Sequence, residues 1–281
     1  ILIANRGEIA VRIIRAAREL GIATVAVYST ADKEALHTLL ADEAICIGPA
    51  KSTDSYLNMN AVLSAAVLTE AEAIHPGFGF LSENSKFATM CEEVGVKFIG
   101  PSGAIMDMMG DKINARAQMI KANVPVIPGS DGEVFTAEEA LEVAEKIGYP
   151  VMLKASAGGG GKGIRKVEKA EDLVAAFESA SSEAKAAFGN GAMYMERVIY
   201  PARHIEVQIL ADQHGHVVHL GERDCSLQRN NQKVLEEAPS VAIGKTLRQK
   251  IGDAAVRAAQ SVGYENAGTI EFLYDENKGE F

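Results

Sequence analysis

The sequence contains no tryptophan and only three cysteines among its 281 residues. Cys46, Cys91 and Cys225 are an odd number and show no C-x-x-C spacing, so neither a disulfide framework nor a zinc site is indicated. Cysteines in this pattern are typical of a reducing compartment, and we expect all three to be small buried hydrophobic residues.

Long apolar runs are absent as well. No stretch approaches the roughly 20 residues that a spanning helix needs, and the first residues lack the charged and apolar regions of a signal peptide. The sequence therefore predicts a soluble, cytoplasmic protein that has no membrane partner. It begins at Ile1 inside an apolar run and ends at Phe281 inside a strand-like pattern, which suggests a fragment of a longer chain.

Basic residues are in the minority. The chain has 28 lysines and arginines against 38 aspartates and glutamates, which gives a net charge of −10 and a pI of about 5.2. This balance disfavours a broad nucleic-acid surface, so an anionic ligand must be held by a focused group of basic residues. The length and the 47% hydrophobic content are ordinary for a globular protein of about two domains.

The first hundred residues alternate between short apolar runs and helical patterns. Strand-like runs lie at 1–4, 24–28, 44–47, 71–74 and 96–99. Between the first two runs, apolar residues from Ile9 to Leu20 follow one helical stripe, and Gly21 ends it. This alternation predicts a parallel sheet wrapped by helices, so residues 1–99 are expected to form a doubly wound α/β domain.

The rest of the chain follows a different order. Residues 100–126 are expected to be short helices and a proline-rich linker. Over 127–198 we expect a small α+β unit: a helix at 136–147 with a capping-box spacing, a strand at 150–155, a helix at 170–188 and a further strand. From 199, two antiparallel strands (203–212 and 216–224), a helix at 245–262 and a last pair of strands are predicted.

Four consecutive glycines precede a lysine in ASAGGGGKGIRKV, residues 155–167. This is no Walker A loop, because Gly163 follows Lys162 where that motif needs serine or threonine. The letters fit the dinucleotide fingerprint G-x-G-x-x-G, but that fingerprint opens a helix, whereas strand-like residues follow Gly163. We expect a loop between two strands in which N–H groups, Lys154 and Lys162 hold a polyphosphate; the alternative is a surface hairpin with solvated lysines.

Several single polar residues stand at strand ends or on strand faces. Lys112 near a helix start and Glu196 after a strand are solvated residues by default, although Glu196 could accept a hydrogen bond from an adenine amino group. His204 and Glu206 lie two apart on a strand and so share a face, where a cross-strand polar pair is the simpler interpretation. Glu271 alternates with apolar neighbours; it either faces water or, near phosphate-binding lysines, holds Mg²⁺.

Two longer segments are also candidates. GERDCSLQRNNQKVLEEAP, residues 221–239, is the densest polar stretch, and we expect a charged loop after a strand. HPGFGFLSEN, residues 75–84, places two glycines in an aromatic turn after a strand, at the edge where an α/β sheet binds its ligands. The alternative for this segment is a packed turn before a helix that Ser82 caps.

Taken together, the motifs resemble the biotin carboxylase family in their order and across the whole chain. They are IANRGEIAVRI, HPGFGFLSEN, MGDK, KASAGGGGKG, YMERVI, RHIEVQ, ERDCSLQRNNQKVLEEAP and GTIEFLY. The resemblance implies an ATP-grasp fold. Its parts would be a Rossmann-like N-terminal domain at 1–99, a linker at 100–126, a lid domain with a glycine-rich loop at 127–198 and the start of a C-terminal α+β domain at 199–281.

The resemblance also implies roles for the matching residues. Lys233 would hold bicarbonate, and Glu271 would be both a catalytic residue and the ligand of Mg²⁺ or Mn²⁺. The cofactor-binding positions would be Lys112, Lys154, Gly160 and Gly161 at the phosphates, Glu196, Arg197, Val198 and Ile199 at the adenine, and His204 and Gln228 near the ribose and its surroundings. Asn231, two residues before Lys233, would be a further cofactor-binding position.

The implied activity is that of a ligase. Bicarbonate attacks the γ-phosphate of ATP, and the CO₂ of the resulting carboxyphosphate is captured by N1 of biotin on a carrier protein. The implied setting is the first half-reaction of acetyl-CoA carboxylase in fatty-acid synthesis, with a biotin carboxyl carrier protein, a carboxyltransferase and a homodimer. The alternatives are a pyruvate or other acyl-CoA carboxylase, one half of a carbamoyl-phosphate synthase, and a nucleotide-binding module without turnover.

The sequence departs from the family pattern at two positions and ends before a third region. Asn231 stands where many members have histidine, and Phe78 replaces a frequent tyrosine. Asn231 can donate a hydrogen bond but carries no charge. In the family, a second metal-binding glutamate, a metal-binding asparagine and a catalytic arginine follow the position of Phe281, so we expect the chain as given to be catalytically incomplete.

Overall fold

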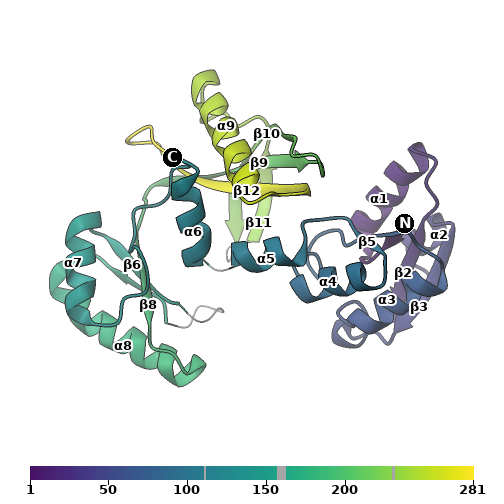
Figure 1. The fold of residues 1–281 in the computed structure, drawn as a ribbon, viewed down its shortest axis with the longest axis horizontal. Helices are drawn as coiled ribbons and strands as arrows, with labels where there is room; N and C mark the ends of the chain where they lie inside the picture. Colours follow the sequence, from purple (N-terminus) through teal and green to yellow (C-terminus); the bar gives the residue numbers. More distant parts are fainter. Residues whose placement is uncertain (111, 157–162, 230–231) are drawn as a thin grey trace. The chain divides into compact units, whose positions relative to one another are not determined.

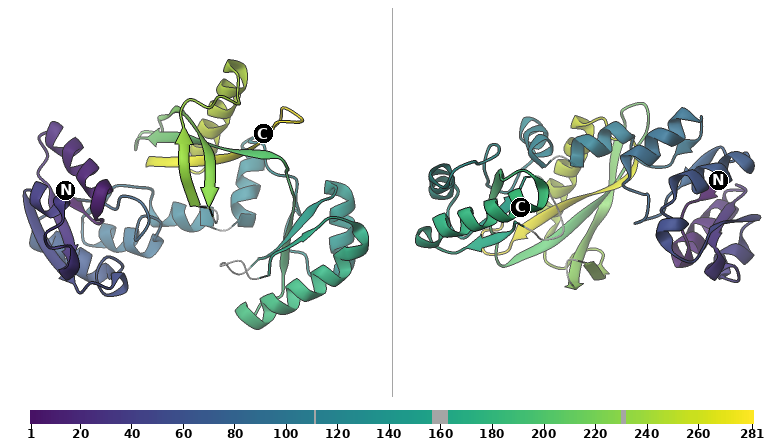
Figure 2. Two further views of the ribbon diagram at one scale, coloured as in Figure 1. Left: turned by 180° about the vertical axis from the view of Figure 1, so that it is seen from behind. Right: turned by 90° about the horizontal axis from the view of Figure 1, so that it is seen from below.

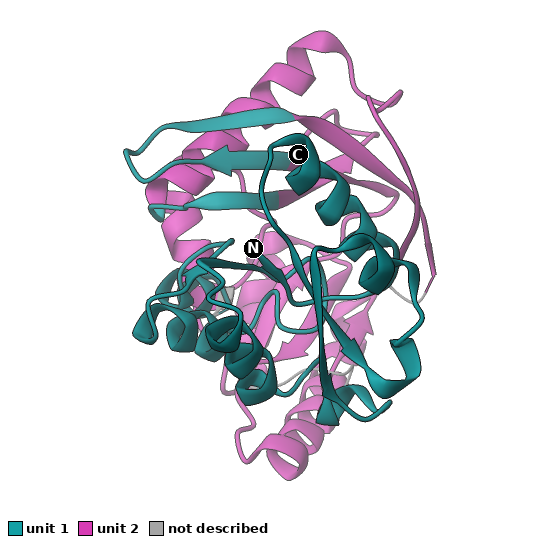
Figure 3. Ribbon diagram, turned by 90° about the vertical axis from the view of Figure 1, so that its right-hand side faces the viewer, with its two compact units in different colours: residues 1–110, 208–220, 262–269 teal, residues 111–207, 221–261, 270–281 magenta. Residues whose placement is uncertain are grey.

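The structure is a computed structural model that describes residues 1–110, 112–156, 163–229 and 232–281, without the side chain of Lys112. The chain divides into two compact units (Figure 3). The first consists of residues 1–110, 208–220 and 262–269, and the second of residues 111–207, 221–261 and 270–281. None of the helices in the described part of the chain combines the length and the apolar composition that a bilayer-spanning segment needs.

Five short parallel strands form the first sheet, in the order β3-β2-β1-β4-β5. Figure 1 labels β2, β3 and β5 of this sheet. The strands are β1 (Leu2–Ile3), β2 (Val25–Ser29), β3 (Glu43–Gly48), β4 (Ala73–His75) and β5 (Lys97–Phe98). Between them lie α1 (Gly7–Glu19), η1 (Thr30–Asp32), α2 (Leu36–Leu40), η2 (Ser52–Asp54), α3 (Met59–Leu68) and α4 (Ser85–Glu93). The strand order reverses direction at β1, so the prediction of a doubly wound α/β fold is confirmed.

Alternating residues of β1 supply two separate cores. Leu2 packs with Val62 of α3 and Phe87 of α4, whereas Ile3 packs with Ile13 and Ile14 of α1. Successive side chains of a strand point to opposite faces, so one two-residue strand anchors helices on both sides of the sheet.

A second sheet has the order β7-β6-β8 and packs against two helices, α7 and α8. Helix α5 (Gly103–Gly110) belongs to the first unit. The second unit begins with α6 (Lys112–Lys121), α7 (Ala137–Ile147), β6 (Val151–Ala155), β7 (Arg165–Val167), α8 (Ala170–Phe188) and β8 (Met193–Arg197). The predicted capping box is present: Thr136 Oγ1 accepts from the N–H of Glu139, and the Glu139 carboxylate accepts from the N–H of Thr136. Strands β6 and β7 are antiparallel, which confirms that the glycine-rich segment joins two strands.

The third sheet has the order β11-β10-β9-β12. Its strands are β9 (Ala202–Ala211), β10 (Val217–Arg229), β11 (Gln232–Glu237) and β12 (Asn266–Asp275), and α9 (Lys245–Ser261) precedes β12. Figure 2 shows β10 and β11 side by side as green arrows. At the end of the chain, where the sequence suggests a further strand, the structure has one isolated bridge between Asp275 and Glu280.

Three expectations are corrected by the structure. Residues 221–239 are mostly the two paired strands β10 and β11 instead of a loop, because charged side chains can alternate across a strand when partners of opposite charge lie beside them. Helix α4 is capped by Asn84, whose Oδ1 accepts from the N–H of Phe87, and not by Ser82. Cys46 is exposed, whereas Cys91 and Cys225 are buried as expected; all three are free.

Candidate active site

One part of the candidate site lies on the sheet β7-β6-β8. Val151 and Leu153 of β6 point into the core under α7 and α8, so Lys154, the next residue after Leu153, points to the opposite face. On β8, Met193 and Met195 point into the same core, so Glu196 points to the opposite face, where its carboxylate forms an ion pair with the amine of Lys154. The strand register pairs Lys154 with Tyr194, which makes Glu196 its diagonal neighbour on that face.

The residues after Glu196 are held by backbone hydrogen bonds to neighbouring segments. The N–H of Arg197 donates to the carbonyl of Pro128 at 2.7 Å, and the N–H of Val198 donates to that of Pro150 at 2.8 Å. Ile199 follows, and like its two predecessors it is half-buried. These bonds fix the segment 196–199 as an extended strip beside the Lys154–Glu196 pair.

The second part of the site is a charged cluster on the sheet β11-β10-β9-β12. Lys233 of β11 pairs with Glu206 of β9, and its Nζ also donates to Oε1 of Glu271 on β12 at 2.7 Å. Arg223 of β10 pairs with the other oxygen of Glu206. Four strands therefore bring two cations and two carboxylates to one face.

His204 and Gln228 extend this cluster. His204 Nε2 lies 3.2 Å from Oε2 of Glu271, and Gln228 Nε2 lies 2.8 Å from His204 Nδ1. Since His204 and Glu206 both reach this cluster, the prediction that they share a face is confirmed. His204 and Gln228 also line a cavity of about 430 Å³ together with Arg203, Ser226 and Leu273, among others.

The cluster holds its carboxylates ionised. The hydrogen bond from His204 lowers the pKa of Glu271 to about 2; burial opposes this shift, and the bond from Lys233 adds to it. Burial alone would raise the pKa of Glu206, but the hydrogen bonds from Lys233 and Arg223 outweigh it and lower that pKa. Burial would likewise lower the pKa of Lys233, but its bonds to Glu206 and Glu271 raise it well above the ordinary value of 10.5.

Glu271 offers the donor chemistry that Mg²⁺ requires. Its carboxylate is 49% exposed and stays charged at neutral pH, and oxygen is the ligand atom that Mg²⁺ prefers. Glu206, Cys225 and Glu236 form a different group of possible ligands, whose donor atoms lie within 4.8 Å of one another. Burial raises the pKa of the Cys225 thiol to about 12, so this group would offer a protonated sulfur and suits a hard cation poorly.

The structure does not place the side chains, or in the case of glycine the backbone, of five predicted residues. Gly160, Gly161 and Asn231 lie outside the described residues, as does Lys162 of the glycine-rich segment. Lys112 is the first residue of α6, but its side chain is not described. The structure places the other predicted residues in two groups, one on the sheet β7-β6-β8 and its edge, the other on the sheet β11-β10-β9-β12.

Two residues of the cluster are missed by reasoning from the sequence. The spacing presents Glu206 as half of a simple polar pair, yet Glu206 is buried and contacts both cations. Arg223 stands in the sequence as one charge in a dense segment. The signal that could have identified these residues is the alternation of polar side chains over 221–239, which is typical of a strand with one charged face.

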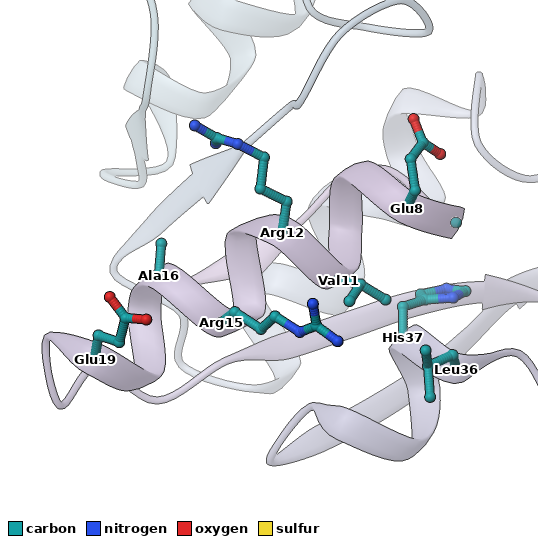
Figure 4. A pocket seen from close by; sticks show the side chains of 9 residues that line it. Glu8, Val11, Arg12, Arg15, Ala16, Glu19, Leu36 and His37 are labelled. Carbon is teal, nitrogen blue, oxygen red and sulfur yellow. The ribbon is translucent and has the colours of Figure 1, made fainter.

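A larger cavity, of about 620 Å³, belongs to the first unit (Figure 4). It is lined by α1 and α2 with Arg12, Arg15 and His37, and it contains none of the predicted site residues. The turn at 75–84 is also part of the first unit. Asn5 Nδ2 holds this turn by donating to the carbonyls of Pro76 and Phe78 at 2.9 and 2.7 Å.

Comparisons with known proteins cover the whole chain. Residues 1–106 match the family model of the biotin carboxylase N-terminal domain, and residues 111–281 match the ATP-binding domain of the carbamoyl-phosphate synthase L chain. Biotin carboxylase 1 of Bacillus subtilis is 58% identical over 99% of this chain and 62% of its own length. A pyruvate carboxylase subunit from Methanothermobacter thermautotrophicus is 53% identical over 100% of this chain and 57% of its own length.

A solved structure agrees with these relatives. The biotin carboxylase domain of 2-oxoglutarate carboxylase from Hydrogenobacter thermophilus, a dimer in complex with MgADP, ADP and bicarbonate, has a TM-score of 0.85. It is 51% identical, and the match covers 98% of this chain and 61% of that chain.

The small sheet beside α7 and α8 and the larger sheet with its charged face define a protein of the ATP-grasp class. Within that class, the family is identified by the two matched domains and by sequence identities of 51–58% over nearly the whole chain. The chain belongs to the biotin carboxylase family, of whose members named above it spans about 57–62% of the length.

Proposed function

We propose that the protein containing this chain carboxylates biotin on a carrier protein, using ATP and bicarbonate. The observation that carries the proposal is the position of Lys233 between the ionised carboxylates of Glu206 and Glu271. A cation held in this way is a fixed binding point for a small oxyanion, and the carboxylate beside it suits a divalent ion. The bicarbonate and MgADP named for the Hydrogenobacter structure support the same assignment.

In this proposal the lid sheet, β7-β6-β8, binds the nucleotide. The amine of Lys154 contacts the ATP phosphates, and the carboxylate of Glu196 accepts a hydrogen bond from the adenine amino group. Both groups must then exchange their present ion pair for contacts to the ligand. Arg197, Val198 and Ile199 line the adenine, since their backbone is already bonded into an extended strip.

The larger sheet binds bicarbonate and the metal. Lys233 holds bicarbonate while Glu271 provides a ligand to Mg²⁺ or Mn²⁺, and His204 and Gln228 meet the ribose from the rim of the cavity that they line. The divalent ion, when bound, neutralises charge on the phosphoryl oxygens. Lys154 and Lys233 add fixed positive charge where negative charge accumulates as bicarbonate oxygen attacks the γ-phosphate.

Several parts of the proposal concern residues beyond the described side chains. Lys112 is assigned to the phosphates, Gly160 and Gly161 to the lid loop that closes over them, and Asn231 to the nucleotide surroundings. The division into a Rossmann-like domain (1–99), a linker (100–126), a lid (127–198) and a C-terminal ATP-grasp domain (from 199) also belongs to the proposal.

The biotin carboxyl carrier protein, the carboxyltransferase, the homodimer and the cytoplasmic location are proposed from the family resemblance. We favour the acetyl-CoA carboxylase of fatty-acid synthesis as the setting. Pyruvate carboxylase or another carboxylase is the second candidate, because the relatives include proteins named for pyruvate and for 2-oxoglutarate.

The test is ATP hydrolysis by the protein that contains this chain. We expect ADP release that requires bicarbonate and Mg²⁺ and that rises on addition of free biotin. ADP release that requires bicarbonate but ignores biotin would favour a carbamoyl-phosphate synthase type of reaction. ATP binding without any bicarbonate-dependent hydrolysis would leave a nucleotide-binding module and overturn the proposal.

A further inference from the structure

The charged cluster occupies one face of the third sheet, and a second polar network occupies the other. Along β10, Glu222 and Asp224 flank Arg223, so the two acids point away from the face to which Arg223 contributes. Both acids are buried, with exposures of 6% and 1%. On β9, Arg203 and His204 divide between the two faces in the same way.

The short contacts of the two acids lead to α9 and to the segment after β11. Glu222 Oε1 accepts from Nε of Arg248 on α9 at 2.7 Å and from the N–H of Ser240 at 3.0 Å. Asp224 Oδ2 accepts from the hydroxyl of Ser240 at 2.7 Å and lies 3.5 Å from a guanidinium nitrogen of Arg203. A longer bond, of 3.4 Å, joins the hydroxyl of Ser226 to Oδ1 of Asp224 within β10 itself.

Arg248 connects this network to the segment after β11. Its second nitrogen, Nη2, donates to the carbonyls of Ser240 and Ile243 at 3.0 and 3.3 Å. One guanidinium therefore ties Glu222 of β10, the turn after β11 and α9 together. This use of several donors in a fixed fork is specific to arginine, because a lysine amine cannot reproduce the geometry.

The backbone pairing between β10 and β11 is irregular just after Asp224. The register between β10 and β11 shifts between Asp224 and Leu227 and again between Leu227 and Gln228. Gln228 is the residue that pairs with Lys233, so the irregular stretch lies directly between the buried acids and the proposed bicarbonate residue. Where this ladder is broken, side-chain bonds add to the positioning that the pairing with β9 provides.

We propose that Glu222, Asp224 and Arg248 are positioning residues on the reverse face of the sheet. They hold β10 so that Arg223 keeps Glu206, and through it Lys233, in place for bicarbonate. This inference rests on the proposed role of Lys233. Glu222 and Arg248 do not line the cavity assigned to the ribose, whereas Asp224 does, so the experiments that test a role through the strand use Arg248.

A first experiment does not depend on enzymatic activity, because the three cysteines of the chain report on local opening of the structure. Cys225 lies in β10 beside Asp224 and is 5% exposed, Cys91 is buried in the first unit, and Cys46 is exposed. In Arg248→Met, we expect the rate of thiol modification at Cys225, followed by mass spectrometry on the folded protein, to rise about tenfold as β10 opens locally. The rates at Cys91 and Cys46 should stay at their wild-type values.

The matched control is Lys146→Met, which breaks the exposed pair with Asp131 on the lid and should change no cysteine rate. Arg248→Lys keeps the charge without the fork and should lie between Arg248→Met and the wild type. It also serves as the test variant should Arg248→Met not fold. An unchanged rate at Cys225 in both Arg248 variants overturns the inference.

The second experiment measures bicarbonate-dependent ATP hydrolysis in the same variants. A misplaced Lys233 should raise the KM for bicarbonate roughly tenfold to a hundredfold and leave the KM for ATP within about twofold. Two results would assign the network a structural role only and overturn the inference. One is faster thiol modification of Cys225 with unchanged kinetics of ATP hydrolysis, and the other is an equal rise in the KM values for bicarbonate and for ATP. If the wild type shows no bicarbonate-dependent hydrolysis, the proposed function fails, while the Cys225 rates still report separately whether the network holds β10.

Discussion

The side-chain amine of Lys233 lies 2.7 Å from Oε1 of Glu271, so the residue assigned to bicarbonate and the residue assigned to the metal hold each other before any ligand is bound. Removing the lysine should therefore affect chemistry more than nucleotide binding. For Lys233→Ala in the full-length protein that contains this chain, we expect turnover to fall at least about a hundredfold and ATP affinity to change by less than about threefold. Isothermal titration with ATP beside steady-state ADP release measures both; an equal loss of ATP affinity means that the role of Lys233 is misassigned.

The bonds that Glu271 accepts from His204 and from Lys233 should appear in the pH dependence of stability. The pKa of Glu271 is lowered to about 2 from an ordinary 4.5, so its contribution is complete above pH 4.5 and is lost as the pH falls towards 2. Because the carboxylate is half exposed, solvent screening limits this contribution to about 1 kcal/mol or less.

Glu271→Gln removes the titrating group and serves as the comparison. The difference in unfolding free energy between wild type and variant, from urea titrations, should be constant from about pH 7 to 5 and shrink from pH 4.5 downwards. A difference that grows on acidification would contradict the assigned direction of the pKa shift.

Glu196 should discriminate between nucleotides. In Glu196→Gln the carboxylate that pairs with Lys154 becomes an amide, which still offers an oxygen but also presents an amino group to the base. We expect the ATP affinity to fall about tenfold, in line with the loss of one charge-assisted hydrogen bond. The preference for ATP over GTP, measured by competition, should narrow; an unchanged preference would remove Glu196 from the adenine site.

In the first unit, Asn5 is a buried residue at which a charge should be costly. It is 4% exposed and donates from Nδ2 to the carbonyls of Pro76 and Phe78. Asn5→Asp places a carboxylate against two carbonyl oxygens, and we expect a loss of about 3 kcal/mol in unfolding free energy at about pH 7. Lowering the pH should recover part of this loss, because a protonated carboxyl can donate one hydrogen bond; no recovery at about pH 4 would contradict the explanation.

The cap of α7 allows a smaller, local prediction. Thr136→Ala removes the hydroxyl that accepts from the N–H of Glu139 at 3.2 Å. The expected cost is about 1 kcal/mol in thermal or urea unfolding, and Thr136→Ser should recover most of it. A Thr136→Ala protein as stable as the wild type would show that the Glu139 half of the capping box is sufficient.

Local pattern is enough to predict most of the fold. The strand-like runs at 24–28 and 44–47 correspond to β2 and β3, and the helix expected at 170–188 is α8 with the same bounds. The N-terminal strands are predictable because a parallel sheet covered on both faces requires short apolar runs. The strand predicted at 216–224 corresponds to the first part of β10, but the continuation of β10 and its pairing with β11 are not predicted, because their polar residues are paired across strands and leave no hydrophobic pattern.

The candidate site is predictable only through motifs. Lys154 and Glu196 are 42 positions apart, and nothing in their local sequence states that they are diagonal neighbours on one sheet face. Glu206 escapes prediction because its burial depends on Arg223 and Lys233, which reach it from two other strands. Strand register and bulges, which create these contacts, are properties of pairing and leave little trace in either strand alone.

Under the proposed function, the internal pairing of Lys154 with Glu196 and of Lys233 with Glu271 would make ligand uptake an ion exchange. A phosphate that binds alone to one of these lysines leaves the paired carboxylate without its cation. A divalent cation that binds alone to one of the carboxylates leaves the paired lysine without its anion. A ligand that brings charges of both signs together, as a metal-bound nucleotide does, supplies a new partner to every group it separates. Selectivity for the complete ligand over its separate ions would then follow from how the protein balances its own charges.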